Sequence, residues 1–297
     1  MRLRAEPVDT RSALKEAIAR LGAANVPSHT LAAELLLMHA LGHDRTWLYA
    51  HPEEPLDSVA AEKYLALVAR RAAGEPTQYL TGKQEFWGLE FEVTPAVLIP
   101  RPETEHVVEV ALERLRARRS NEPNATLRVA DVGTGSGCLA VALAHESPRA
   151  EIFATDISAA ALEVARRNAV RHGVADRIHF HHCDLLRGLA HESRFDLIVS
   201  NPPYVARNEA ADLPREVREH EPHSALFGGA TGVEFYAQLV REAAQLLRPG
   251  GILILELGYN SLDHVRAIFD ADVRWTNVAI TMDLAGIPRV FAAERAD

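Results

Sequence analysis

The residues with the clearest potential for chemistry read Asn-Pro-Pro-Tyr at 201–204, directly after an apolar run, 195–200. Two consecutive prolines fix φ and remove two N–H donors, so the segment turns rigidly and offers carbonyl oxygens. The side-chain oxygen of Asn201 and the carbonyl of Pro202 could accept both hydrogens of a planar NH2 group, and Tyr204 offers a flat face for stacking. The segment predicts a site for an amide or amine nitrogen. The structural alternative is a proline-stiffened turn at a strand end.

A glycine-rich segment at 131–138 carries the second set of candidates. It joins an expected strand to an expected helix, and its glycines let the backbone approach a ligand without interference from a Cβ atom. The spacing is G-x-G-x-G from Gly133 to Gly137, with Cys138 where a dinucleotide-binding loop would carry its third glycine. This variant suits a ligand without phosphate, with the loop beside a ribose and an amino-acid tail.

Residues at the ends of the next two expected strands extend this second site. Asp156 closes the strand at 151–156, where a carboxylate can accept both ribose hydroxyl hydrogens. The alternative role of Asp156 is to cap the helix that follows. After the next strand, Asp184 is expected near an adenine amino group and Leu185 against the adenine face.

Four metal-ligating residue types also occur close together, at His179, His181, His182 and Cys183. Side chains on a strand alternate between its two faces, so these groups cannot all converge on one ion. We therefore expect no metal.

The elements that must position these residues follow from hydrophobic periodicity. Helical patterns alternate with short apolar runs at 127–132, 151–156, 177–182, 195–200 and 251–257. This alternation predicts βαβ units, hence an α/β fold whose mostly parallel sheet has helices on both faces and ligands at the carboxyl ends of its strands. Two last runs, at 273–280 and 289–293, are expected to add an antiparallel part.

The N-terminal part has a different texture. Apolar residues recur at helical spacing from Thr10 to about Ala73, which predicts a module of about four helices. Apolar and polar residues then alternate on both sides of Gly88, which predicts a hairpin. We expect a helical domain at 1–82, a hairpin connector at 83–100 and an α/β domain at 101–297.

Composition narrows the class of protein. The 297 residues are 47% hydrophobic and 25% charged, as in an ordinary folded protein. No signal-peptide pattern or membrane-spanning apolar stretch is evident, and two cysteines cannot form a disulfide framework, so we expect a cytoplasmic protein. The formal net charge of −9 argues against a large phosphate-contacting surface, so no direct nucleic-acid binding is expected.

With these features in place, the chain resembles class I methyltransferases and, over nearly its full length, the HemK/PrmC family of release-factor glutamine methyltransferases. The segments that carry the resemblance are 75–76, 78–82, 85–88, 97–105, 131–137, 201–204, 221–222, 225–226, 228–229, Gly286 and 289–290. The resemblance implies a Rossmann-like, doubly wound, mostly parallel seven-stranded sheet. It also implies a small N-terminal helical domain joined to that sheet by a β-hairpin.

The resemblance implies methyl transfer from S-adenosyl-L-methionine, with S-adenosyl-L-homocysteine as product, to the N5 amide nitrogen of a glutamine. That glutamine lies in the Gly-Gly-Gln motif of class 1 peptide chain release factors, which the N-terminal module would help to engage, and its methylation would modulate translation termination. An amide nitrogen is a poor nucleophile, so positioning must supply most of the catalysis.

Family resemblance also implies a role for each candidate residue. Those implied for the cofactor are Gly133, Thr134, Gly135, Ser136, Gly137, Asp156, Asp184, Leu185 and Asn201. Those implied for the substrate glutamine are Asn201, Pro202, Pro203 and Tyr204, of which Asn201, Pro202 and Tyr204 are expected to act in catalysis.

Three departures from the family pattern are visible. Leu185 stands where some relatives have an aromatic residue, and residues 229–232 lack an acidic residue before the last glycine. Residues 256–261 follow the family pattern only at their first three positions. None of them touches the expected chemistry. Glu103 and Glu105, inside a matching segment, favour a helix dipole, and a substrate contact by either stays open.

Other functions stay open on the residues alone. A ribosomal-protein glutamine methyltransferase would share the same site. A DNA adenine or ribosomal-RNA methyltransferase would also present a planar NH2 group, but the acidic charge and the lack of a basic target-recognition segment with interleaved aromatics disfavour it. A non-catalytic cofactor-binding or interaction protein is disfavoured because the glycine loop, Asp156 and the proline turn occur together.

Overall fold

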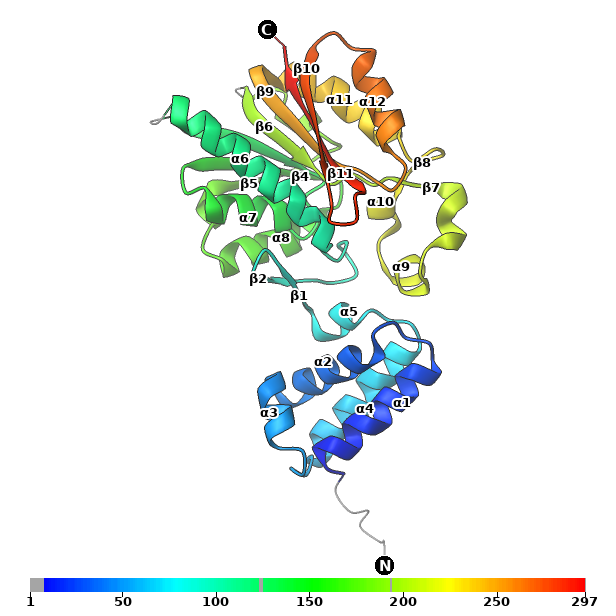
Figure 1. Ribbon diagram of the computed structural model, residues 1–297. Helices are drawn as coiled ribbons and strands as arrows, with labels where there is room; N and C mark the ends of the chain where they lie inside the picture. The colour runs from blue at the N-terminus through cyan, green and yellow to red at the C-terminus, as the bar shows by residue number, and fades with distance from the viewer. Residues whose placement is uncertain (1–7, 123–124, 193, 297) are drawn as a thin grey trace, which may run out of the picture. The chain divides into compact units, whose positions relative to one another are not determined.

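The computed structural model describes residues 8–122, 125–192 and 194–296 (Figure 1). The chain divides into two compact units. One unit comprises Met1–Lys83 with Pro214–His220, and the other comprises Gln84–Leu213 with Glu221–Asp297. Among the described residues, no helix is both long and apolar enough to cross a membrane.

The first unit is helical. Its described residues up to 81 form five helices, one more than expected: α1 (Thr10–Ala23), α2 (His29–Leu41), α3 (Arg45–Ala50), α4 (Ser58–Ala72) and α5 (Thr77–Thr81). The core contains Leu21, Leu36 and Tyr64. Val59 and Leu65 carry part of the helical periodicity, yet they are exposed, because α4 buries the opposite side that contains Tyr64.

Aspartates cap three of these helices, α1, α3 and α4, and in α3 the Asp44 carboxylate accepts from Trp47 N at 2.7 Å. The Asp9 carboxylate accepts a hydrogen bond from Ser12 N at 2.7 Å, and the Asp57 carboxylate accepts one from Ala60 N at 2.8 Å. Each side chain satisfies a backbone donor that has no partner within its own helix, which is why such residues stabilise helix starts.

The expected hairpin is present and packs within the second unit. Strands β1 (Lys83–Phe86) and β2 (Leu89–Glu92) flank a turn in which Trp87 and Gly88 both have positive φ. The buried Asn168 side chain of α8 (Ala159–Arg171) accepts from Glu92 N at 2.7 Å and donates to Glu92 O and Ser136 O. Asn168 therefore ties the hairpin to the glycine-rich loop.

The second unit is built on a seven-stranded sheet in the order β10-β11-β9-β6-β3-β4-β5. Its strands are β3 (Leu127–Val132), β4 (Ala150–Asp156), β5 (Ile178–His182), β6 (Phe195–Ser200), β9 (Leu247–Glu256), β10 (Trp275–Met282) and β11 (Pro288–Arg295). The five strands from β9 to β5 are parallel, while β11 runs antiparallel to β9 and to β10. The α/β prediction is confirmed, including its antiparallel end.

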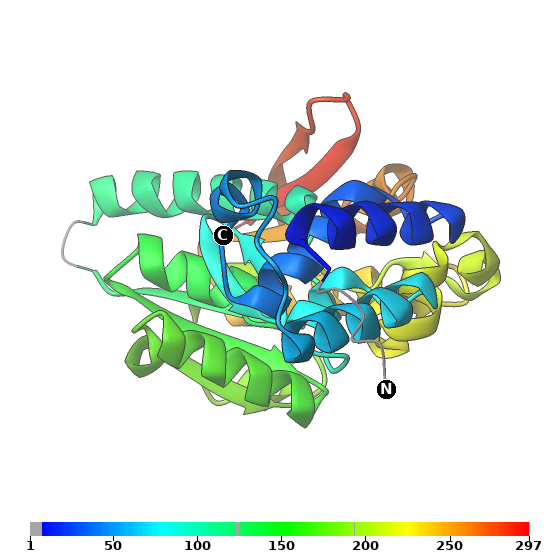
Figure 2. The ribbon, with the colours of Figure 1, turned by 90° about the horizontal axis from the view of Figure 1, so that it is seen from below.

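Helices cover both faces of this sheet (Figure 1). One face carries α6 (Glu105–Asn121), α7 (Cys138–Glu146) and α8, and the other carries α11 (Glu234–Leu246) and α12 (Leu262–Asp270). Along β3, Val129 packs in the first layer and Ala130 in the second, as the two-residue period of a strand requires. The turn between β10 and β11, red in Figure 2, extends beyond the other strands of the sheet.

The remaining elements of the described chain are short. They are β7 (Val205–Ala206), β8 (Phe227–Gly229), α9 (Arg215–His220), α10 (His223–Leu226) and the 3-10 turns η1 (Pro102–Thr104), η2 (Ala175–Arg177), η3 (Arg187–Leu189) and η4 (Arg207–Asp212). Strands β7 and β8 pair in parallel and hold the segment after the proline turn.

Candidate active site

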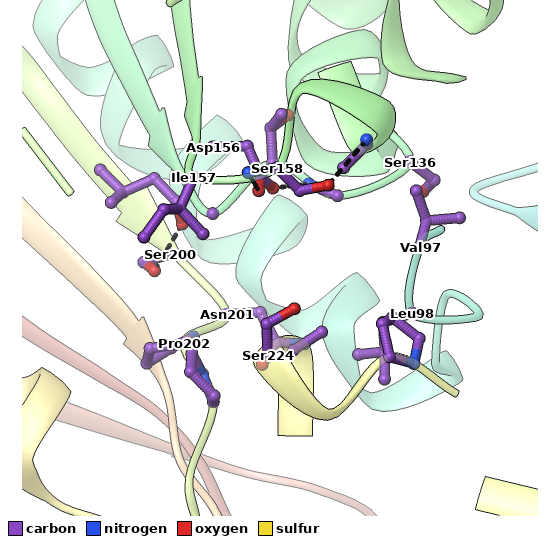
Figure 3. A pocket seen from close by; sticks show the side chains of 18 of the residues that line it. Val97, Leu98, Ser136, Asp156, Ile157, Ser158, Ser200, Asn201, Pro202 and Ser224 are labelled. Carbon is purple, nitrogen blue, oxygen red and sulfur yellow. Dashed lines mark hydrogen bonds between the residues drawn. The ribbon is translucent and has the colours of Figure 1, made fainter. Parts of the chain in front are cut away.

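An open cavity of about 1030 Å³ lies at the carboxyl ends of the parallel strands, within the second unit. In Figure 3, Asp156 and Ser158 lie at one end of the cavity, and Asn201, Pro202 and Ser224 lie at the other. The sheet topology explains the meeting of residues that are far apart in sequence, because parallel strands end at the same edge.

The glycine-rich loop forms part of the cavity wall. Gly133, Gly135 and Gly137 all have positive φ, which L residues rarely adopt, so this path requires glycine. A Cβ atom at Gly137 would also lie 3.0 Å from the Cβ of Ala165, because α7 packs closely against α8 there. Gly133 N and Thr134 N both donate to Thr155 O at 2.9 Å, which anchors the loop to β4.

A buried aspartate holds the loop from behind. Asp131 Oδ2 accepts hydrogen bonds from Thr134 Oγ1 at 2.6 Å and from Ala140 N at 3.1 Å. Burial raises the pKa of Asp131 to about 7. Ser136 and Thr134 are buried too, so the backbone and small side chains of this loop, rather than charges, face the cavity.

Asp156 lies opposite the same loop. Its Oδ2 accepts from Gly135 N at 2.9 Å and its Oδ1 accepts from Ser158 N at 2.8 Å. Burial raises the pKa of this carboxyl above its ordinary value, with the backbone hydrogen bonds acting against that rise. Ser158, not Asp156, caps α8, so the capping alternative for Asp156 is wrong. Each carboxylate oxygen can still accept a second hydrogen bond.

The next strand end contributes Asp184 and Leu185, which both line the cavity. Asp184 pairs with Arg187 Nη1 at 3.1 Å. Leu185 has a φ of 49°, which is a strained backbone conformation for a leucine. The residue is only 9% exposed, so the surrounding packing can hold this conformation. An apolar side chain therefore stands beside the loop where an adenine face is expected.

The proline turn supplies the opposite end of the cavity. Asn201, Pro202 and Pro203 line it, directly after the buried end of β6. Ser200 Oγ donates to Val132 O at 2.7 Å and so fixes β6 to β3 just before the turn. Asn201 Nδ2 donates to Thr104 Oγ1 at 3.1 Å. The turn thus brings to the cavity a side-chain amide whose NH2 group already donates one hydrogen bond, to Thr104.

Tyr204 is the member of the turn that does not line the cavity. Its ring packs beside Gly258, where a Cβ atom would come within 2.6 Å of the ring, and it joins the apolar cluster on the α11 side of the sheet. The stacking of Tyr204 on a planar substrate group stays a prediction. In the described arrangement, Tyr204 supports the turn from behind.

An ion pair joins two segments of the cavity wall. Glu221, which is buried, accepts from Arg101 Nη2 at 2.5 Å and from Ile99 N at 3.2 Å. The pair ties the segment before η1 to the segment that brings Ser224 into the wall. Sequence reasoning noted both motifs but assigned them no role.

The histidines near the end of β5 do not converge. His179 and His181 both lie against the Phe153 ring, whereas His182 Nε2 bonds to Ile157 O at 2.9 Å. Within the part of the chain that the structure describes, no group of three or more His, Cys, Asp or Glu residues could hold a metal ion.

The two glutamates at the start of α6 have structural partners. Glu105 accepts from Trp87 N at 2.8 Å, and Glu103 lies 3.9 Å from Arg289 Nη2. Neither lines the cavity. The cavity wall instead includes Val97, Leu98 and Phe235, for which the sequence offered no signal beyond membership of matching or apolar segments.

Gly228 packs so closely against the backbone of the proline turn that a side chain at this position has no room. A Cβ atom there would lie 2.5 Å from Pro203 O and 2.6 Å from Gly232 O, both of them backbone atoms that cannot move independently. Gly228→Ala should therefore displace the turn and destabilise the fold by about 1–3 kcal/mol, the usual cost of overpacking. Calorimetry should record a lower Tm together with reduced activity. Gly22→Ala, whose Cβ would have ordinary contacts at 3.5 Å, is the matched control; an equal effect in both variants would contradict the argument.

Two family models match the chain. The PrmC N-terminal domain matches residues 12–82, and the Methyltransferase small domain matches residues 109–217.

Curated relatives match over almost the whole length. A release factor glutamine methyltransferase of Koribacter versatilis is 45% identical over 285 residues, which are 96% of this chain and 98% of the relative. The release factor glutamine methyltransferase of Moorella thermoacetica is 46% identical over 96% of this chain and 98% of the relative. That of Nitratidesulfovibrio vulgaris is 43% identical over 95% of this chain and 94% of the relative.

Solved structures show the same fold at low identity. The hMettl16 catalytic domain in complex with MAT2A 3'UTR hairpin 1 matches with a TM-score of 0.58 at 16% identity, covering 93% of this chain and 90% of that chain. A methyltransferase from Pyrococcus furiosus matches with a TM-score of 0.50 at 19% identity, covering 77% of this chain and 98% of that chain. These likenesses support the predicted class I methyltransferase fold and nothing finer.

Proposed function

The chain belongs to the release factor glutamine methyltransferase family, and we propose that it methylates the N5 amide nitrogen of a release-factor glutamine from S-adenosyl-L-methionine. The observation that carries this proposal is the cavity with Asp156 at one end and the Asn201 turn at the other. A nucleoside can be held at the first end and a planar amide at the second.

The residues at the Asp156 end fit the cofactor chemically. An ionised carboxylate is an acceptor for two ribose hydroxyls, the glycine loop offers close approach of the backbone, and Leu185 offers an apolar surface for a base. No basic side chain lies among the loop residues 133–137, which agrees with a ligand that has no phosphate. When bound, S-adenosyl-L-methionine supplies a methyl group on a positively charged sulfur.

The residues at the Asn201 end would position the nucleophile. Asn201 Oδ1 and Pro202 O can each accept one hydrogen of the glutamine NH2 group, which fixes the plane and direction of the nitrogen. These two acceptors would also stabilise the positive charge that develops on nitrogen as its bond to the methyl carbon forms. Asn201 takes no proton, because an amide is not a base at neutral pH; the proton leaves to solvent.

We also propose that the N-terminal helices take part in engaging the release factor. This part of the chain matches the PrmC N-terminal domain. Tyr49 and Val59 are 61% and 75% exposed there, so both side chains are accessible to a partner.

A labelling experiment tests the substrate. The purified chain should transfer labelled methyl from S-adenosyl-L-methionine to a class 1 release factor, and it should not label the same factor with its Gly-Gly-Gln glutamine replaced by alanine. Ribosomal proteins, ribosomal RNA and DNA serve as competing substrates in parallel reactions. Equal labelling of the factor and its alanine variant, or preferential labelling of a competing substrate, would refute the proposal.

A further inference from the structure

The orientation of the Asn201 amide decides what this end of the cavity can bind. An asparagine side chain carries an acceptor oxygen and a donor NH2 group on the same carbon, and a half-turn exchanges them. Asn201 can accept from a substrate NH2 group only when its oxygen points toward the cavity. In the reversed orientation the NH2 group of Asn201 would face the substrate NH2 group, and two donors cannot hydrogen-bond to each other. Something in the fold must therefore select one orientation.

Thr104 contacts the amide from η1. Its Oγ1 accepts the hydrogen bond from Asn201 Nδ2 at 3.1 Å, and the residue is 2% exposed at the cavity wall. Asn201 Oδ1 accepts no hydrogen bond from any residue in the described part of the chain. A hydroxyl has a single proton. The orientation of Asn201 thus depends on which group receives the Thr104 proton.

Glu256, the last residue of β9, is the buried acceptor beside Thr104. Glu256 is 2% exposed, and hydrogen bonding by the neighbouring Thr104 side chain lowers the pKa of its carboxyl. Its Oε2 is buried without a hydrogen-bond partner among the described residues, so this oxygen is available to accept the Thr104 proton. An ionised carboxylate only accepts. Thr104 must then donate to Glu256, and it can only accept from Asn201.

We propose that Glu256 and Thr104 form a hydrogen-bond relay that locks the Asn201 amide with its oxygen toward the cavity. Both are positioning residues for methyl transfer, since they act through Asn201 and not on the substrate. This inference rests on the proposed function, for which it supplies the element that selects an acceptor for the glutamine NH2 group.

The charge of Glu256 decides which residue donates the hydrogen bond between Thr104 and Glu256. Burial, followed by the Glu103 carboxylate, raises the pKa of Glu256 to about 7, while Thr104, Arg289 and Arg101 lower it. Other titratable groups around this carboxyl are Tyr204, Tyr236 and Cys138. The ionised carboxylate accepts, and the relay holds; once acidification protonates Glu256, this residue can donate to Thr104, and the orientation of Asn201 is released.

Steady-state kinetics distinguish a Thr104 that positions Asn201 through its hydroxyl from a Thr104 that only fills space. Thr104→Val keeps the shape but removes the hydroxyl, and it should lower kcat by about 10–100-fold while the Kd for S-adenosyl-L-homocysteine stays within about threefold. Thr104→Ser restores the hydroxyl and should recover kcat to within about threefold of wild type. Wild-type kcat in Thr104→Val, or no recovery in Thr104→Ser, would overturn the relay.

A spectroscopic test needs neither substrate nor activity. In the full chain with 15N-labelled asparagine, the Asn201 NH2 signal is identified by its loss in Asn201→Ala. Its proton exchange should be slow in wild type and in Thr104→Ser, and about tenfold faster in Thr104→Val. Its shift should titrate near pH 7 in wild type and not in Glu256→Gln.

The two tests distinguish the failure of this inference from that of the proposed function. Persistent titration of the Asn201 signal in Glu256→Gln, or unchanged exchange in Thr104→Val, overturns the relay even if the release factor is methylated. If the release factor is not methylated but the Asn201 signal responds as expected, the relay stands and the substrate assignment fails.

Discussion

Replacing Asn201 by alanine should lower kcat for methyl transfer by roughly 10²–10³-fold, the loss typical when one preorganised polar group is removed from a developing charge. The reason is local: Asn201 is the residue at its end of the cavity whose side-chain oxygen is directed by a fixed hydrogen bond, Nδ2 to Thr104 Oγ1 at 3.1 Å. The backbone turn itself should survive, because Pro202 and Pro203 define its path.

The measurement is single-turnover transfer of labelled methyl to the release factor, beside calorimetric binding of S-adenosyl-L-homocysteine. Cofactor affinity should change little, since the loop and Asp156 lie at the other end of the cavity. Asn208→Ala, an exposed asparagine seven residues further along, is the matched control and should retain wild-type turnover. Near-normal turnover in Asn201→Ala would remove Asn201 from the mechanism.

The second large effect is expected at Asp156, where replacement by alanine should weaken cofactor binding by about 100-fold. Two hydrogen bonds to a charged acceptor would be lost, each worth about 1.5–3 kcal/mol before relaxation. Gly135 N and Ser158 N would lose their partner as well, so the loop itself would loosen. Asp156→Asn, which keeps one acceptor oxygen, should show an intermediate loss.

Binding of S-adenosyl-L-homocysteine by titration calorimetry measures this effect directly. Because burial raises the pKa of Asp156, wild-type affinity should begin to fall on acidification at a higher pH than for an exposed aspartate, and this pH dependence should vanish in Asp156→Asn. Asp176→Ala, at an exposed aspartate, serves as control. Unchanged affinity in Asp156→Ala would exclude the ribose role.

The sequence predicted the second unit well because its signals are local. Short apolar runs can be recognised one strand at a time, and the residues immediately after them, such as Asp156 and Asn201, must then lie at the carboxyl edge of a parallel sheet. The glycine spacing from Gly133 to Gly137 was similarly informative, since positive φ at those positions is a property of single residues.

Periodicity was less reliable in the helical unit. Val59 and Leu65 contributed to the helical pattern of α4 but are exposed, while Tyr64 is fully buried in the core. An apolar residue on a helix can lie on either side, and the side that is buried depends on which neighbouring helices pack against it.

The sequence by itself determined the class of fold, the family and the residues at the two ends of the cavity, because each is carried by short segments that can be recognised one at a time along the chain. Only the tertiary structure decided how Asn201 is held: Thr104 and Glu256 come from η1 and from the end of β9, 97 residues before it and 55 after it. It also decided that Tyr204 packs behind the turn. Contacts of this kind depend on which strands become neighbours in the sheet, and no local pattern of residues records that choice.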